Sequence, residues 1–110
     1  MALFSFFKSD DVDAFAKTLA EDIAKRYPPR MDLEREQSGK VSVERVTRIL
    51  EGAYDKAIEF QKQTSLGLYR KARLLNTFKW SLKELGYSDT FVDLATEGLV
   101  VYLSRGPKTA

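Results

Sequence analysis

A line of aromatic, basic and amide side chains recurs at helical spacing in the second half of the chain. Its members follow one another at steps of four or three residues: Tyr69, Arg73, Asn76, Trp80 and Lys83. Residues at these steps share one face of a helix. Arg70, Lys71 and Lys79 add positive charge beside that face. The line is therefore the strongest candidate for a binding surface.

Three roles fit residues of this kind. Tyrosine, tryptophan and arginine are the residue types that most often anchor protein interfaces. Aromatic rings between cations also suit single-stranded nucleic acid, because the rings stack on bases while the cations neutralise phosphates. The third role is packing, in which Tyr69 and Trp80 fill a groove against a neighbouring helix and the basic side chains extend into solvent. Packing is the commonest of the three.

A second candidate surface is the apolar segment at residues 1–8. It contains Phe4, Phe6 and Phe7, followed by Lys8. A phenylalanine ring buries about 150 Å² or more when it is covered, so three exposed rings are unfavourable in water. We expect these rings to dock on their own bundle, on a second copy in a homodimer, or weakly on a membrane surface. Docking within the chain is the preferred interpretation.

The composition argues against an enzyme. The 110 residues contain neither histidine nor cysteine, which removes the commonest general base, thiolate nucleophiles, and zinc sites built on nitrogen or sulfur ligands. Two acidic groups, at residues 10–13 and 89–97, match neither the spacing of a calcium-binding loop nor that of a di-iron bundle. We interpret them as solubility and orientation devices. We expect no catalytic residues, no metal and no cofactor.

The elements that position these residues are predicted to be helices. Apolar residues recur with a period near 3.6 over residues 10–26, 42–62, 66–85 and 89–104. A chain of 110 residues is the size of one domain. The sequence therefore predicts an all-α, compact single-domain bundle of about four helices, in which residues 28–41 form a flexible connection and residues 105–110 a frayed tail.

The predicted third and fourth helices have distinct faces. The expected core stripe of the third helix consists of Leu68, Ala72, Leu75, Phe78, Leu82 and Leu85. Gly86 should end that helix in a left-handed conformation, and Ser88 should begin the next one. In the fourth helix, residues 99–103 are apolar on every side, which indicates either central burial or a subunit interface. The β-branched pair Val100 and Val101 leaves a short strand as the less favoured alternative.

The short turn at Gly86 also resembles the connection of a helix-turn-helix motif. The second helix of that motif would expose Asp89, Asp93 and Glu97, which repel DNA phosphates. DNA binding through this helix is therefore disfavoured.

The sequence contains no run of about 20 apolar residues that could span a membrane. Its formal net charge is only +2, so a nucleic-acid site would require local clustering of cations. We expect a small cytoplasmic, non-enzymatic interaction module that binds a protein partner, either as a homodimer or as an adaptor on a larger protein. The alternative is binding of RNA or single-stranded nucleic acid through the basic and aromatic face of the third helix.

Overall fold

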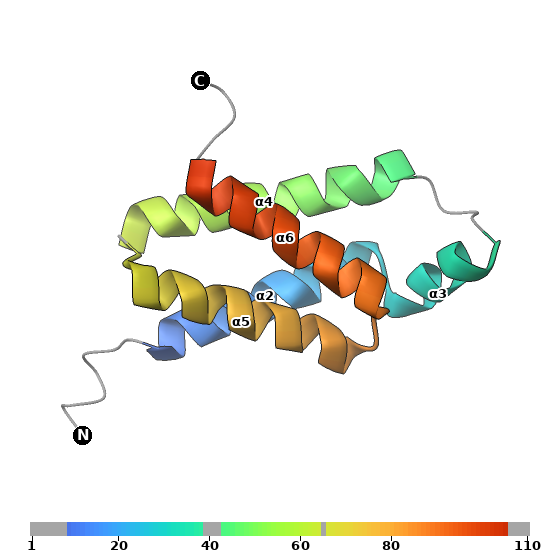
Figure 1. Cartoon of the computed structure of the whole chain (residues 1–110), viewed down its shortest axis with the longest axis horizontal. Coiled ribbons are helices and arrows are strands. Elements are labelled where there is room, and N and C mark those ends of the chain that lie inside the picture. Colours follow the sequence, from blue (N-terminus) through green and yellow to red (C-terminus); the bar gives the residue numbers. More distant parts are fainter. Residues whose placement is uncertain (1–8, 39–42, 65, 106–110) are drawn as a thin grey trace.

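The computed structural model describes residues 9–38, 43–64 and 66–105, and all its regular elements in these ranges are helices (Figure 1). They are α2 (Ser9–Arg26), α3 (Pro29–Ser38), α4 (Val43–Thr64), α5 (Leu68–Leu85) and α6 (Asp89–Arg105). The predicted all-α single-domain bundle is confirmed. The described ranges contain five helices rather than about four, because a further helix lies between the first two predicted ones.

The two helices α2 and α5 lie side by side and run in the same direction. Asp11 and Asp13 of α2 form ion pairs with Arg70 and Arg73 of α5, in the same order along both helices. The turn at Gly86 connects α5 to α6, which packs against α5 and runs in the opposite direction.

The helices α4 and α6 also run in parallel. Tyr54 and Gln61 of α4 donate hydrogen bonds to the carbonyl oxygens of Ala95 and Leu103 in α6, again in the same order along both helices. Because α4 also contacts α2, the four long helices form a closed ring in the order α2, α4, α6, α5. Figure 1 shows this ring with α5 and α6 nearest the viewer.

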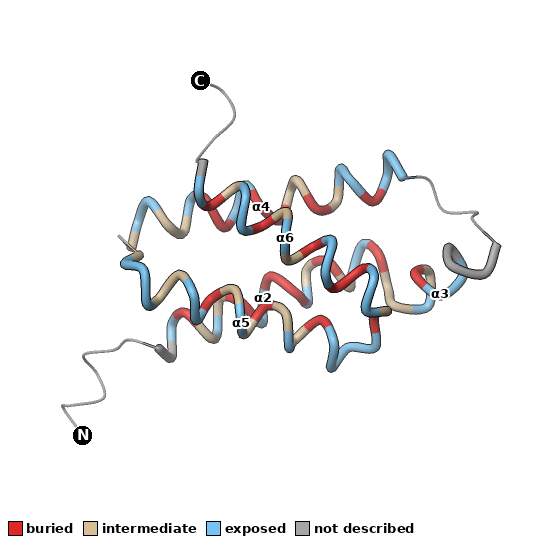
Figure 2. Tube along the Cα trace, in the orientation of Figure 1, coloured by how far each residue is buried: buried red, intermediate tan, exposed pale blue. Residues whose placement is uncertain are grey.

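The core lies between the four long helices, as the buried segments in Figure 2 show. Its largest fully enclosed side chains are Tyr27, Phe78 and Phe91. Tyr27 stacks against Tyr87, with ring centroids 6.2 Å apart, and packs in a tilted orientation against Phe91, with ring centroids 5.1 Å apart. Aromatic packing therefore joins the end of α2 to the start of α6.

The predicted core stripe of α5 is only partly correct. Phe78 and Leu82 are buried as expected, but the third buried residue is Leu74, and Leu68 is 85% exposed. Ala72 and Leu85 are exposed as well. The buried face is rotated toward α2, because α5 packs against α2 as well as against α6.

The segment predicted as a flexible connection, residues 28–41, contains the helix α3. Proline is favoured in the first turn of a helix, and Pro29 begins this one. Asp32 of α3 is fully buried and accepts hydrogen bonds from the Tyr27 hydroxyl (3.2 Å) and the Ser88 backbone N–H (2.9 Å). This carboxylate attaches α3 to the start of α6.

The apolar end of α6 is buried on one side only. Leu99 and Leu103 are in the core, whereas Val100 and Val101 are 41% and 44% exposed. Within the described ranges, no helix is long and apolar enough to cross a membrane. The predicted apolar segment 1–8 with Phe4, Phe6 and Phe7, and residues 106–110 of the predicted tail, lie outside the described residues.

Candidate functional site

The candidate surface is the outer face of α5, and the ends of this helix are well defined. Gly67 precedes its first residue in an extended conformation. At the other end Gly86 adopts the predicted left-handed conformation, with φ of 106°, and the last turn closes on the carbonyl oxygens of Leu82 and Lys83. Because Phe78 and Leu82 are buried, the opposite side of the helix faces solvent.

Both aromatic residues of the predicted line lie on that solvent side. Tyr69 is 61% exposed and Trp80 is 53% exposed. Asn76, which lies between them, is exposed too. The predicted packing of Tyr69 and Trp80 in a groove against a neighbouring helix is therefore wrong. Both rings are exposed, as binding to a protein or to nucleic acid would require.

The arginine of the line, Arg73, and its neighbour Arg70 are held by α2 instead. Both oxygens of the Asp11 carboxylate accept hydrogen bonds from Arg70 Nη2 at 2.9 Å. Asp13 accepts from Arg73 Nε at 3.1 Å and from Nη2 at 2.9 Å, and its Oδ1 also accepts from the Thr77 hydroxyl. Such two-point contacts restrict the guanidinium to one orientation.

These contacts change the protonation of the pair. The hydrogen bond from the Arg73 guanidinium holds the pKa of Asp13 below its ordinary value, although burial opposes this shift. The same bond raises the pKa of Arg73. The sequence interpretation treated the acidic residues near the start of α2 as orientation devices and missed this pairing. Their opposite charge to the α5 arginines was the only available signal.

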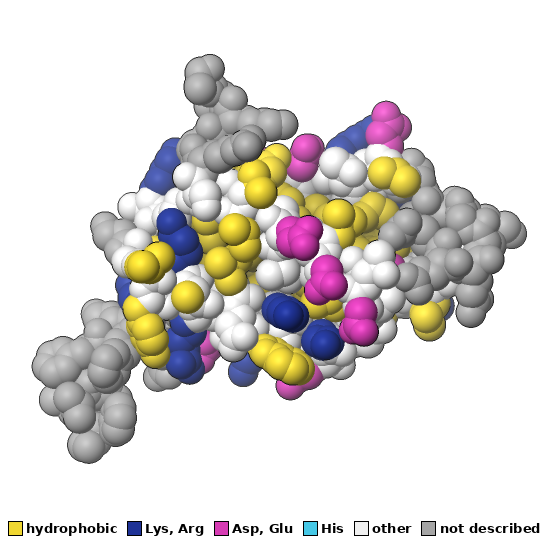
Figure 3. Space-filling view, in the orientation of Figure 1, with side chains coloured by type: hydrophobic (Ala, Val, Ile, Leu, Met, Phe, Trp, Pro, Cys, Tyr) yellow, Lys and Arg dark blue, Asp and Glu magenta, His cyan; other side chains and the backbone are white. Residues whose placement is uncertain are grey.

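Lys83 and Trp80 interact with each other. The Lys83 ammonium lies 5.2 Å from the centroid of the Trp80 ring, and it is 3.7 Å from the Asp89 carboxylate of α6. A cation over an indole ring is attracted by the electrons of the ring face. Lys79 is half-buried and belongs to no ion pair among the described residues. Figure 3 shows basic side chains over α5 beside a row of acidic ones along α6.

A second surface feature, which the sequence interpretation did not predict, is a groove between α4 and α6. Its volume is about 210 Å³ and most of its walls are apolar. It is lined by Thr47, Leu50, Glu51, Tyr54, Leu94, Gly98 and Tyr102. Burial raises the pKa of Tyr54, and burial together with the nearby carboxylates of Glu51 and Asp55 raises the pKa of Tyr102. Both hydroxyls therefore remain neutral at physiological pH.

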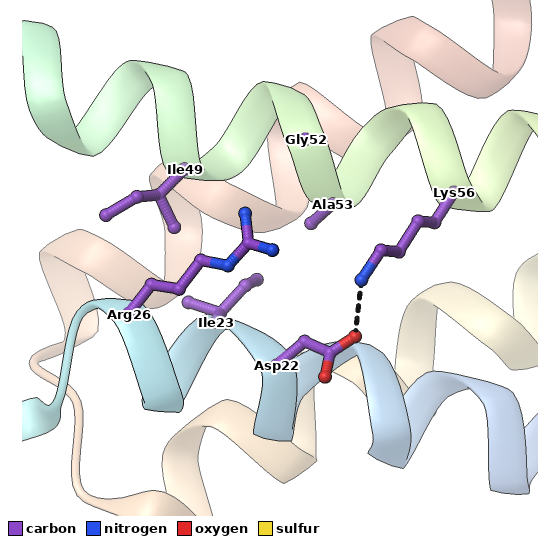
Figure 4. Close-up of a pocket in the computed structure, with 7 residues that line it drawn as sticks. All are labelled: Asp22, Ile23, Arg26, Ile49, Gly52, Ala53 and Lys56. Carbon is purple, nitrogen blue, oxygen red and sulfur yellow. Dashed lines mark hydrogen bonds and ion pairs between the residues drawn. The ribbon is translucent and has the colours of Figure 1, made fainter.

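A third feature lies between α2 and α4, where Figure 4 shows the side chains around a small pocket. Lys56 Nζ and Asp22 Oδ2 are 2.8 Å apart at one side of it. The hydrogen bond from Lys56 lowers the pKa of Asp22. The space amounts to about 10 Å³, which is close to the volume that one water requires. We therefore interpret this pocket as part of the helix packing.

The described part of the chain contains no group of three or more acidic side chains that could hold a metal ion. Comparisons with protein-family models, with curated proteins and with solved structures gave no match for this chain.

Proposed function

We propose that this protein is a small non-enzymatic interaction module that binds another protein through the outer face of α5. The observation that supports this function is the exposure of Tyr69 and Trp80 on one face of a single helix. They are separated by eleven residues, about 16 Å along the helix at 1.5 Å per residue. An interface of ordinary size is long enough to cover both.

The structure around these rings favours a stable binding surface. The helix is anchored by Phe78 and Leu82 on its inner side and by the ion pairs of Arg70 and Arg73 with α2. A partner would therefore meet side chains on a rigid support, and little conformational entropy would be lost on binding. Exposed tryptophan and tyrosine on such a support are typical centres of binding energy.

The same ion pairs make nucleic-acid binding the weaker alternative. Arg70 and Arg73 contribute two of the cations that this function requires, and each already contacts a carboxylate of α2. Lys83 lies near Asp89 in addition. A phosphate backbone would have to compete with these carboxylates, which reduces the electrostatic gain of binding.

A photo-crosslinking experiment tests the proposal. A photoreactive amino acid replaces Asn76, which is exposed between the two aromatic residues, in the full chain expressed in its own organism. The control carries the same group at Glu59, which is exposed on α4. We expect a discrete protein adduct from position 76 and none from position 59.

The adduct should depend on the aromatic residues. Trp80→Ala and Tyr69→Ala should each reduce its yield about tenfold or more, as expected for central interface residues. Leu33→Ala removes a similarly exposed apolar side chain from α3 and should leave the yield unchanged. Equal yields from all variants would refute the proposal. Salt-sensitive binding of a mixed single-stranded oligonucleotide pool, lost in Trp80→Ala, would support the nucleic-acid function instead.

A further inference from the structure

We infer that one partner of the α5 face is a second copy of this chain, whose groove between α4 and α6 receives Trp80. This inference rests on the proposed function, because it uses the same α5 face. It adds the identity of the partner and a second, complementary surface.

The groove has the shape and lining to receive an aromatic side chain. Leu94 on one wall is 51% exposed, while Leu50 and Tyr54 on the other are buried. Its volume of about 210 Å³ provides room for one large side chain. Concave, mostly apolar sites of this kind are where aromatic anchors insert at protein interfaces.

The charges at the two surfaces are complementary. Carboxylates flank the groove on both helices, with Glu51 and Asp55 on α4 and Glu97 on α6, and none of them forms an ion pair within the described ranges. Beside Trp80, the α5 face carries Lys79 and Lys83. An approaching α5 face would therefore bring Lys79, together with Lys83 that already lies 3.7 Å from Asp89, toward these carboxylates, which favours correct orientation and rapid association.

The two surfaces lie on different sides of the helix ring. The groove is formed by α4 and α6, whereas Trp80 projects from α5. Each copy thus carries one aromatic surface and one groove, and the contact between copies joins unlike surfaces. Such head-to-tail contacts produce closed rings or open chains, depending on the rotation between successive copies.

Two variants, each lacking one of the surfaces, provide the test. Trp80→Ala removes the aromatic anchor and keeps the groove. Leu94→Arg places a charge in the groove and keeps the anchor. Sedimentation velocity of the wild-type chain, at concentrations rising to the millimolar range, should show oligomers whose size is set by whether the contacts close into a ring. Each variant alone should be monomeric, with its dissociation constant raised about 30-fold or more, as for a central interface residue.

Mixing the variants gives the decisive result. The intact groove of Trp80→Ala can accept the intact anchor of Leu94→Arg, so an equimolar mixture should form a one-to-one heterodimer that grows no further. Leu33→Ala on α3 and Thr18→Arg on α2 are the matched controls, because both residues are exposed and lie outside the two surfaces. Each control should assemble as the wild type does, and circular dichroism should show that all variants are folded.

Other outcomes would overturn the inference. A wild-type chain that stays monomeric at every concentration would exclude self-assembly through these surfaces. Oligomers that persist in both variants would indicate a different contact, such as the N-terminal phenylalanines. The proposed function fails separately, when crosslinking at position 76 yields no adduct with any protein. A monomeric chain that still gives a Trp80-dependent adduct with another protein would refute only the self-assembly.

Discussion

The ring of Tyr54 occupies the space that a side chain at Gly98 would need. A Cβ atom built on Gly98 would lie 2.9 Å from Tyr54 Cε2 and 2.8 Å from Cζ, and closer still to the hydroxyl. The hydroxyl itself donates a 2.8 Å hydrogen bond to the Ala95 carbonyl oxygen. The parallel helices α4 and α6 therefore approach closely because residue 98 is glycine.

Gly98→Ala should destabilise the fold. Alanine improves helix propensity by about 1 kcal/mol, but the overpacking against a buried tyrosine costs about 1–3 kcal/mol. We expect a net decrease in the free energy of unfolding, measured by urea denaturation. Gly52→Ala is the control, since its new Cβ would meet only the Arg26 side chain at 3.7 Å. That variant should gain about 0.5–1 kcal/mol, and a loss equal to that of Gly98→Ala would contradict the steric explanation.

Asp32→Ala should loosen α3. The substitution removes the acceptor of two donors, the partly buried Ser88 N–H and the buried Tyr27 hydroxyl. A buried donor that is left without an acceptor destabilises a folded protein by about 1–3 kcal/mol. Denaturation should show this loss, and amide hydrogen exchange in α3 should become faster. Asp93→Ala, at an exposed acidic residue of α6, should change the stability by only about 0.5 kcal/mol.

The ion pair between Asp13 and Arg73 should make stability depend on pH in the acidic range. The pKa of Asp13 is lowered in the folded state from its ordinary value of 3.8, chiefly by the Arg73 hydrogen bond. Because the pKa of Asp13 is lower in the folded than in the unfolded state, the ion pair stabilises the fold fully at pH values above the unfolded-state pKa. This stabilisation is lost as the pH falls through the folded-state pKa.

A double-mutant cycle measures this contribution. Asp13→Asn, Arg73→Gln and the double variant should show a favourable coupling at neutral pH, and the coupling should shrink progressively below about pH 4. High salt should weaken it at neutral pH, because the pair is partly exposed. A coupling that is constant between neutral pH and pH 2 would show that the ion pair does not contribute in this way.

Trp80 and Phe78 should respond very differently to truncation. Phe78 is fully buried, so Phe78→Ala should lower the free energy of unfolding by about 3–5 kcal/mol. Trp80 is 53% exposed, and its replacement loses mainly the contact with Lys83, worth about 1 kcal/mol. Thermal denaturation of both variants would check this. A loss of several kcal/mol in Trp80→Ala would mean that this residue serves the core rather than a binding surface.

Much of the fold was predictable because its signals are local. The 3.6-residue period identified all four long helices. Gly86 ends α5 as expected, and the Ser88 hydroxyl accepts a hydrogen bond from the Phe91 N–H as a helix cap should. The helix α3 was missed because its main anchor, Asp32, accepts a hydrogen bond from Ser88, which is distant in the sequence. A polar segment with such an anchor has no apolar stripe to reveal it.

The sequence by itself determined which residues share a helix face, since the backbone repeat depends only on local hydrogen bonds and sterics. It therefore placed Tyr69, Asn76 and Trp80 together on one line. The tertiary structure decided which neighbours each face meets. It directs Arg70 and Arg73 to the acidic residues of α2, leaves Trp80 in solvent, and forms the groove between α4 and α6. Those outcomes depend on how whole helices pack, and helix packing brings together residues that no local periodicity relates.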